Sequence, residues 1–591
     1  MNKLKLFPIA LTALVLGACS SEDVIDNGGQ GPVAPGEKGY ISLGINLPTT
    51  PSSRAGNDNF ADGTASEYAV KDATLIIFEG TTEADATVTG VYDLGDDLRF
   101  ETSTPSDDNI TTTYQLTQAV NKPAAGKNLY ALVVLNKGDI DLKDRNLTTL
   151  EKFTTIAQTD DFLDGSYILM TNAPLYTTPG GKTVPTNGKV VTLTEINPEN
   201  VFTTEAEAKA NPAANVYVER ALAKVTVNAN ASGYNPGNGK FTNAEVKGYV
   251  LDVTNKTSYL VRNIPADAAW WSYKSSALGT SSSVDPYRFV GSASVGDNFL
   301  GDNLYRIYWG VDPNYRSYTA SNYGSSENNG DFDRAGKTPS LTEVGDASYC
   351  KENTFNVANQ KQDGTTRVIV AAKITVNGSD ATTGTFYTLD NNKDVIYNGQ
   401  NIENVIKSYF IENEQVSKVL QDNLTTGNHD VASLLDISFD KNAGDVKVKD
   451  ITFIDGAGSH FNGSSVPAEL KAGGAAYSAA LTEINSHVYS CYASGIAYYP
   501  VMIKHFGDDL TPWSADNKTE SYPGPDAEAN WLGRYGVLRN NWYEINVTGI
   551  KSIGSADVPD VDGTPDDPLE SWISVEINVL SWAKRTQNVD L

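Results

Sequence analysis

Residues 40–47 alternate between apolar and polar side chains and stand apart from the rest of the chain. The apolar positions are Ile41, Leu43, Ile45 and Leu47, and Ser42, Gly44 and Asn46 lie between them. A period of two predicts a β-strand with one buried side. The next residues are polar and lead to Arg54, and Ala55 begins another small, polar stretch of the kind that proteases cut. A cut after Arg54 would separate this strand from its own domain.

Further short β-rich runs, bounded by turn residues, follow along the whole chain, a spacing typical of β-sandwiches. We expect strands at 73–78, 129–135, 167–170, 189–193, 216–227, 246–253, 305–308, 366–376, 446–453, 496–505, 542–547 and 574–580. Short helices are predicted at 147–156 and 205–210, and long amphipathic helices are scarce. The predicted fold is therefore mostly β.

The N-terminus has the pattern of a bacterial lipoprotein signal. Lys3 and Lys5 precede an apolar run that ends in small residues before Cys19. The run is too short to span a bilayer as a helix. We therefore predict lipidation of Cys19 after removal of residues 1–18, and a tether rich in Gly, Pro, Asp and Asn over 23–39.

Length and charge narrow the classes of protein further. A chain of 591 residues is too long for one core. Near residue 228 the closely spaced short strands give way to longer polar loops. We expect a domain boundary there, to within some tens of residues. The formal charge of −28 should repel nucleic acid and anionic lipid, and it favours solubility. Nucleic acid is therefore excluded as a partner.

Residues that carry chemistry are few and scattered. His429, His460, His487 and His505 show no paired metal-ligand spacing, and hydrogen-bonded or solvated histidines are expected. Sequences that imitate a phosphate loop, a calcium loop and a nucleophile elbow each lack a required residue. Cys350 and Cys491 are expected to be buried free thiols. We predict no catalytic residue, no cofactor, no metal site and no enzymatic activity.

Several motifs together carry a resemblance to a known family. They are the lipoprotein signal, the isolated strand, the sequence Ser53-Arg54-Ala55-Gly56, the run VERALAKV at 218–225, the block VLRNNWYEI at 537–545 and the ending at 579–591. In this order the chain resembles the Mfa-type minor-fimbrium fimbrillins, shaft subunits of the type V pili of anaerobic Gram-negative bacteria. Ser581 stands where the family often has Pro, which leaves the turn before the final segment less defined.

The resemblance implies a fold and a mechanism. It implies two transthyretin-like β-sandwich domains of the fimbrillin type, here at 55–228 and 229–591, after a propeptide at 19–54. It also implies export to the outer membrane as a lipoprotein, removal of the N-terminal strand by an arginine-specific protease at Arg54-Ala55, and entry of a neighbour's C-terminal strand into the emptied groove. The partners implied are identical subunits, the protease, and fimbrial anchor and tip proteins, with host or bacterial surface ligands as further candidates.

Two segments near the C-terminus are candidates for the strand that is donated. Val575, Ile577 and Val579 alternate with polar residues, and Val589 and Leu591 form a second, smaller apolar face. The first segment has the equally good interpretation of a resident strand of the second domain. The pattern does not decide between the two.

Three classes of function follow. The first is a structural subunit of a cell-surface fimbrium that supports adhesion. The second is a lipid-anchored carbohydrate-binding protein that stacks sugars on exposed aromatic residues, for which the candidates are Trp270, Trp271, Tyr315, Tyr318 and Trp513. The third is a tip or anchor subunit of the same fimbrium, and Arg54 argues against the anchor, which should resist cleavage.

Overall fold

The computed structural model describes most of the chain between residues 32 and 581. The described residues are 32–46, 67, 69–94, 113–144, 146–158, 162–165, 167–179, 188–237, 239–264, 289–291, 304–316, 331–355, 360–427, 429–440, 442–506, 532–561, 563 and 573–581. They confirm the predicted mostly β fold with two sandwiches. Within them, no helix is long and apolar enough to cross a membrane.

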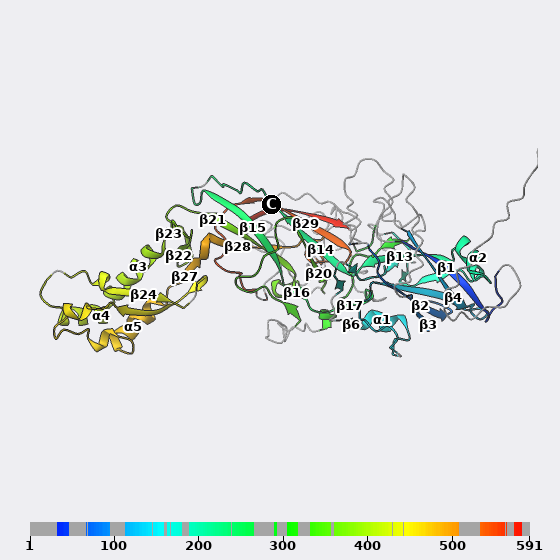
Figure 1. Cartoon of the computed structure of the whole chain (residues 1–591), viewed down its shortest axis with the longest axis horizontal. Coiled ribbons are helices and arrows are strands. Elements are labelled where there is room, and N and C mark those ends of the chain that lie inside the picture. Colours follow the sequence, from blue (N-terminus) through cyan, green and yellow to red (C-terminus); the bar gives the residue numbers. More distant parts are fainter. Residues whose placement is uncertain are drawn as a thin grey trace, which may run out of the picture.

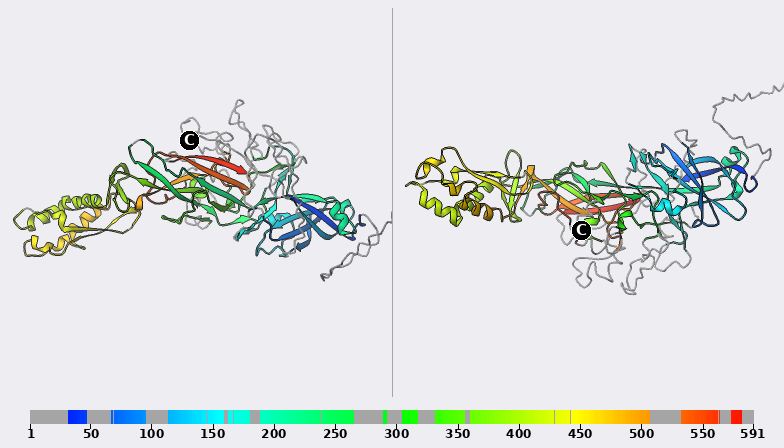
Figure 2. Two further views of the ribbon diagram at one scale, coloured as in Figure 1. Left: turned by 45° about the horizontal axis from the view of Figure 1, so that its top comes forward. Right: turned by 90° about the horizontal axis from the view of Figure 1, so that it is seen from below.

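The molecule is elongated and consists of three parts in a row (Figure 1). The first sandwich lies at one end, the second sandwich in the middle, and a subdomain that contains α3, α4 and α5 at the other end. The two further views in Figure 2 show the same order. The N-terminal strand β1 and the helical subdomain are therefore at opposite ends of the molecule.

The first sandwich is built from one eight-stranded sheet that folds over its own core. In spatial order its strands are β3 (Thr87–Asp93), β2 (Ala73–Gly80), β5 (Asn128–Leu135), β9 (Met170–Asn172), β13 (Ala214–Arg220), β1 (Lys38–Asn46) and β4 (Thr113–Asn121), and β12 (Thr194–Ile196) pairs with β5. The core of this sandwich lies between β1 on one side and the pair β2 and β5 on the other. Leu43, Leu75 and Val133 from these strands belong to one cluster of buried side chains.

Two short helices belong to this sandwich, and both were predicted. Helix α1 (Leu150–Thr155) buries Phe153, whose ring packs edge-on against Phe78 at 5.8 Å between centroids. Helix α2 (Glu205–Ala210) begins after Thr204, whose hydroxyl accepts a hydrogen bond from the backbone N–H of Glu207. Helix α2 lies beside β1 (Figure 1).

The chain passes from the first sandwich to the second at Ala221. The expected single strand at 216–227 is wrong, because β13 ends at Arg220 and β14 (Leu222–Asn228) begins a different sheet. Both strands are largely buried, and no turn residue stands between them, so the sequence gives no sign of the change of sheet. We propose the domain boundary at Ala221, within the margin around the expected position near 228.

The second sandwich packs a four-stranded sheet against a three-stranded sheet. The first contains β20 (Ala347–Lys351), β14, β29 (Asn541–Ile550) and β30 (Ile573–Ser581), and the second contains β15 (Asn243–Asp252), β21 (Arg367–Thr375) and β28 (Ile496–Met502). Their facing side chains, such as Val225, Val370 and Ile545, form one large core. Strands β14 and β29 run parallel, although more than 300 residues separate them.

The third part is inserted between β21 and β28 and was not expected. It contains α3 (Gly399–Glu412), α4 (Glu414–Asn423) and α5 (Ala475–Ile484). Its strands are β22 (Phe386–Leu389), β23 (Asn392–Tyr397), β24 (Leu435–Phe439), β25 (Gly444–Val446), β26 (Val448–Phe453) and β27 (Tyr489–Tyr492). Helices and strands share a separate core. The sequence analysis did not predict the amphipathic helix α3, in which Ile402, Ile406 and Phe410 form a buried stripe at helical spacing.

Short ladders complete the described structure. They pair β6 (Ala157–Gln158) with β17 (Ser258–Tyr259), β7 (Leu163–Asp164) with β8 (Tyr167–Ile168), β16 (Thr254–Asn255) with β19 (Phe332–Asp333), and β10 (Leu175–Tyr176) with both β11 (Val190–Val191) and β18 (Tyr305–Arg306). Cys350 and Cys491 are buried free thiols, as predicted.

Candidate functional site

Strand β1 lies inside the first sheet, between β13 and β4. It pairs in parallel with β13 from Leu43↔Ala214 to Asn46↔Tyr217. On its other side it pairs antiparallel with β4 along its whole length, from Lys38↔Asn121 to Asn46↔Thr113. Removal of β1 would therefore leave two backbone edges without partners and would separate β4 from the sheet.

The apolar face of β1 forms part of the core. Ile41, Leu43 and Ile45 are fully buried, in one cluster with Leu116 of β4 and Val216 of β13. Each such side chain contributes roughly 1.5–3 kcal/mol when it leaves water. The vacated groove would be apolar and would need another strand with the same alternation.

The opposite face of β1 is buried as well, so the expected single buried side is wrong. Ser42 and Asn46 are buried, and Thr117 donates a hydrogen bond of 3.4 Å to Ser42 Oγ. A Cβ placed on Gly44 would lie only 2.5 Å from Asn215 Oδ1, so that side chain occupies the space above the strand. The sequence signals only the apolar side, because small polar residues are found on covered and exposed faces alike.

The start of β1 is held by the segment before α2. Tyr40 and Phe202 exchange backbone hydrogen bonds of 2.7 and 2.9 Å, and the Val33 N–H donates to the carbonyl of Val201. A Cβ on Gly39 would lie 2.8 Å from the carbonyl oxygen of Phe202 and 2.9 Å from Val201 Cγ1. This close approach requires glycine at position 39.

A cavity of about 530 Å³ lies beside β13. Its lining includes Leu175, Val191, Ala213, Asn215, Tyr217 and Leu304. Asn215 therefore has the cavity on one side and Gly44 of β1 on the other. The cavity leaves space next to the Asn215 side chain.

Only some of the predicted donor residues are among those that the structure describes. Strand β30 pairs with β29 at the edge of its sheet, where Val579 stands opposite Tyr543. Val575 and Ile577 are buried in the core of the second sandwich. In this structure the segment is a resident strand. Val589 and Leu591 lie outside the described residues, as do Cys19, Leu47, Arg54 and Ala55.

The aromatic candidates for carbohydrate binding lie mostly outside the described residues. Trp270, Trp271, Tyr318 and Trp513 lie outside the described residues, and Tyr315 lies in a 3-10 turn, Pro313–Arg316.

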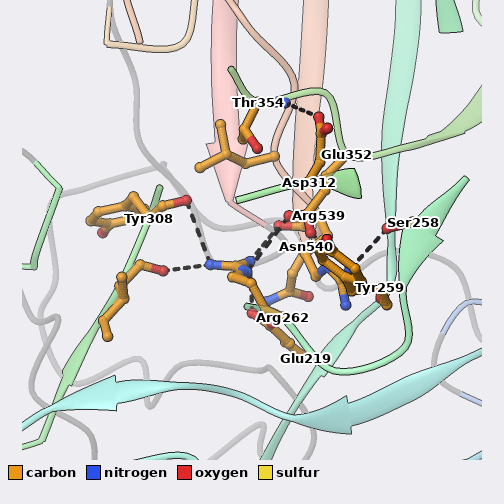
Figure 3. A network of polar contacts seen from close by, with 12 residues as sticks. Glu219, Ser258, Tyr259, Arg262, Tyr308, Asp312, Glu352, Thr354, Arg539 and Asn540 are labelled. Carbon is orange, nitrogen blue, oxygen red and sulfur yellow. Dashed lines mark hydrogen bonds and ion pairs between the residues drawn. The ribbon is translucent and has the colours of Figure 1, made fainter. Parts of the chain in front are cut away.

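A buried network of charged side chains connects the two sandwiches (Figure 3). Arg262 lies at its centre, and its Nη2 is 2.8 Å from Glu219 Oε2 at the end of β13. Its Nε is 3.6 Å from Glu352 Oε2, and Arg539 Nη2 lies 2.7 Å from the other oxygen of Glu352. Arg262 and Arg539 are completely buried.

Hydrogen bonds to backbone carbonyls and to a hydroxyl add to the ion pairs of this network. Arg539 donates to the carbonyl of Tyr259 and to the hydroxyl of Ser258, at 2.7 and 3.0 Å. Arg262 donates to the carbonyl of Ile307 at 2.5 Å. Because buried charges are costly unless paired and hydrogen-bonded, these contacts keep the segments in one arrangement.

Burial shifts the ionisation of several groups in the network. Loss of hydration raises the pKa of Glu219 and lowers that of Arg262, while their mutual attraction opposes both shifts. Burial also raises the pKa of Asp312 to about 7, although the N–H of Thr354 and the side-chain amide of Asn255 donate to it.

The segment after β1 reaches the same junction through Glu67. Arg220 Nε donates to the Glu67 carbonyl at 2.8 Å, and the Tyr349 hydroxyl donates to Glu67 Oε1 at 2.6 Å. Lys224 Nζ lies 2.6 Å from the same oxygen and 4.0 Å from the ring centroid of Trp542. Arg220 and Lys224 belong to the run at 218–225, so this motif joins the two sandwiches.

Sequence reasoning did not predict these charged residues. Arg262, Glu352 and Arg539 are far apart along the chain, and a charged residue in a polar loop normally indicates solvent exposure. One sequence feature could have indicated the buried network: Arg220, Lys224 and Arg539 stand inside or beside otherwise apolar strands.

Comparison with known families gives one match. Residues 490–588 match the family described as major fimbrial subunit protein type IV, fimbrillin, C-terminal. The predicted resemblance to the fimbrillins is confirmed. The matched segment includes β28, β29 and β30, and it also contains Arg539 of the buried network.

Several solved structures are weakly similar to this chain. A fimbrilin from Porphyromonas gingivalis has 11% identity and a TM-score of 0.32, over 93% of this chain and 99% of that chain. A candidate cell adhesion protein from Parabacteroides distasonis has 9% identity and a TM-score of 0.35, over 93% and 99%. One from Bacteroides eggerthii has 10% identity and a TM-score of 0.33, over 93% and 97%. A search among curated proteins found no match. Similarities of this size carry no argument about function.

Proposed function

We propose that this chain is a structural subunit of a cell-surface fimbrium and that it polymerises by strand exchange after a protease cut. The observation that carries the proposal is the position of β1 in the first sheet. It is an inner strand with three fully buried aliphatic side chains. Residues 47–72 join it to β2. The match of residues 490–588 to a fimbrial subunit family supports the same conclusion.

The first step of the proposed mechanism is lipidation at Cys19 and transport to the outer membrane. The precursor keeps β1 in its sheet, which satisfies the edges of β13 and β4. The subunit is therefore folded and inert toward its neighbours while it is anchored.

The second step is a cut between Arg54 and Ala55 by an arginine-specific protease. β1 then has no covalent link to the rest of the fold and is held only by its ladders and its apolar face. Glu67 lies beyond the cut and stays bound to Arg220, Lys224 and Tyr349. The junction between the sandwiches is thus kept when β1 leaves.

The third step is entry of a neighbour's C-terminal segment into the groove. We propose residues 582–591, with Val589 and Leu591, as the donor. Burial of Val575 and Ile577 in their own sandwich supports this choice, because donation of β30 would open that core. The vacated groove offers a parallel edge along β13 and an antiparallel edge along β4, and strand addition to such edges is an established mode of peptide binding.

The buried network suits a subunit of a filament. A filament subunit carries force between the groove at one end and the donor segment of the second sandwich. Charged side chains that hydrogen-bond in fixed directions resist sliding and rotation of one sandwich against the other.

The test is the substitution Arg54→Ala in cells that express the chain, with Lys38→Ala as a control for loss of a nearby positive charge. We expect Arg54→Ala to yield a folded, lipidated precursor and no ladder of high-mass species on electrophoresis after mild heating. Lys38→Ala should polymerise normally. Normal filaments from Arg54→Ala, without a new cut nearby, would refute the proposal. Cys19→Ser should leave precursor with its signal attached, and normal surface display of this variant would refute the lipidation step.

A further inference from the structure

Two histidines that are 31 residues apart in the sequence meet in the helical subdomain. His429 Nδ1 and His460 Nδ1 are 3.1 Å apart, and the two rings are nearly perpendicular with centroids separated by 5.1 Å. Both side chains are half-buried. The sequence spacing gave no sign of this pair.

The surroundings of His429 fix which of its nitrogens carries the proton. Its Nε2 lies 3.0 Å from the carbonyl oxygen of Thr425, which only accepts hydrogen bonds. The Thr425 hydroxyl is also 3.0 Å from Nε2, but it donates its proton to the carbonyl of His460. Nε2 is therefore the donor to both Thr425 oxygens, and Nδ1 of the neutral ring presents a lone pair toward His460. A backbone carbonyl bound to the far nitrogen is the usual partner of a metal-binding histidine, because it orients the ring and raises its basicity.

The backbone holds both imidazoles in place. The segment after α4 and the segment after the 3-10 turn Ala457–His460 run side by side, with an isolated bridge between Leu424 and Phe461. The Thr425 N–H donates to the carbonyl of His460 at 3.0 Å, and the Asn462 N–H donates to the carbonyl of Asn423 at 2.7 Å. The two rings therefore meet without a change of the backbone.

The separation of the two nitrogens fits a shared metal ion. Two imidazole nitrogens at about 2.0–2.1 Å from one tetrahedral ion lie roughly 3.3–3.4 Å apart. A shift of a few tenths of an ångström from the observed 3.1 Å produces that distance. The proton that His460 Nδ1 donates in the hydrogen bond is released, or moves to Nε2, when the metal binds. Imidazole nitrogens prefer zinc, copper and nickel over magnesium or calcium.

We infer that His429 and His460 form a two-imidazole site for a divalent transition ion, with Zn²⁺ as the simplest occupant. In the described parts of the chain, no group of three or more His, Cys, Asp and Glu side chains is arranged around one point. The remaining coordination positions are therefore open to water or to a donor from another molecule. The site follows the end of α4, at the end of the molecule opposite β1, so it does not depend on strand exchange (Figure 1).

The test is calorimetric titration of the purified, untagged chain with ZnCl₂. We expect one saturable site whose affinity falls by roughly tenfold or more in His429→Ala and in His460→Ala, since even outer-shell changes weaken metal sites by this factor. The control is His487→Ala, which removes a histidine of the same subdomain that contacts Asp390 instead. It should bind zinc like the unchanged chain.

If the two rings only form a hydrogen bond with each other and bind no metal, the titration gives a different result. In that case zinc binding is absent, or it persists equally in His429→Ala and His460→Ala, and either outcome overturns the inference. If an alanine variant unfolds, His429→Asn and His460→Asn keep a polar side chain at the same positions. Zinc binding at full strength in both asparagine variants overturns it as well.

Discussion

Glu67 and Lys224 form an ion pair of 2.6 Å between the segment that follows β1 and the first strand of the second sandwich. Both side chains are almost fully buried, with 3% and 6% of their surface exposed. Because Glu67 lies C-terminal to Arg54, a cut at the proposed site would leave this contact in the chain. It connects the residues next to the proposed cut with the junction that holds the molecule together.

Glu67→Ala should lower the free energy of unfolding of the precursor by about 3–5 kcal/mol, because removal of one partner leaves a buried charge without compensation. Urea denaturation measures this loss. Asp164→Ala is the matched control: Asp164 pairs with Lys71 at 3.0 Å on the exposed surface, and its loss should cost less than about 1 kcal/mol. Equal effects of the two substitutions would contradict the proposed role of the Glu67 contact.

Gly39→Val should weaken the packing of β1 in its sheet, because the added side chain would clash with the carbonyl oxygen of Phe202 and with the side chain of Val201. Overpacking of this kind costs typically about 1–3 kcal/mol. The precursor should melt at a lower temperature, whereas cut subunits in filaments should be unaffected, since they lack β1.

Gly44→Ala serves as the control for Gly39→Val. Its closest contact is the end of the Asn215 side chain, which has a cavity beside it. A smaller loss of precursor stability is expected. The account of β1 would be wrong if Gly39→Val left the precursor unchanged.

Asp312→Asn should flatten the pH dependence of stability between about pH 4 and 7. Burial raises the pKa of Asp312 to about 7 in the folded chain, against roughly 3.9 in the unfolded chain. The folded state therefore binds more protons in this window, and stability falls as the pH rises, by up to about 1.4 kcal/mol per pH unit. Melting temperatures at pH 5 and pH 7 give the slope. The same slope in the variant would show that Asp312 does not titrate in this window.

Deletion of 582–591 should give a folded chain that is cut at Arg54 and stays monomeric. Strand β30 and its buried Val575 and Ile577 are retained in this variant, so the second sandwich keeps its core. A synthetic peptide of residues 582–591 should bind the cut subunit and raise its melting temperature. Polymerisation of the shortened chain would assign the donor role to β30. Polymerisation after deletion of 573–591 would exclude strand exchange through this end.

Much of the β-structure was predictable because its alternation is local. Strands β2, β5, β15, β21 and β29 lie within a few residues of their expected positions, and α2 has the expected bounds. The division at Ala221 was not predictable, because β13 and β14 are both largely buried and no turn residue separates them.

The helical subdomain was missed for a different reason. Its helices are short, and α3 and α4 begin after asparagines, Asn398 and Asn413, a residue type that is also common in loops. Asparagine is also a favoured helix cap, and both side chains accept hydrogen bonds from the first turn of the helix that follows. The spacing of Ile402, Ile406 and Phe410 was the signal.

In the candidate site, too, some features were predictable from the sequence and others were not. Strand β1 and its apolar face were predictable from residues 40–47 alone. The partners of this strand, the burial of Ser42 and the network around Arg262 depend on residues that are distant in the sequence. No local pattern brings Glu219, Arg262 and Arg539 together; only the crossing of the chain between the sandwiches does.

The most direct test of the account is the peptide composition of filaments sheared from cells. Purified filaments are analysed by N-terminal sequencing, and the peptide that contains residues 40–46 is quantified by mass spectrometry against a peptide from β29. The account predicts Ala55 as the first residue and no stoichiometric amount of the 40–46 peptide. Filaments whose subunits begin at Cys19, or that retain the β1 peptide in equal amount to the β29 peptide, would contradict strand exchange.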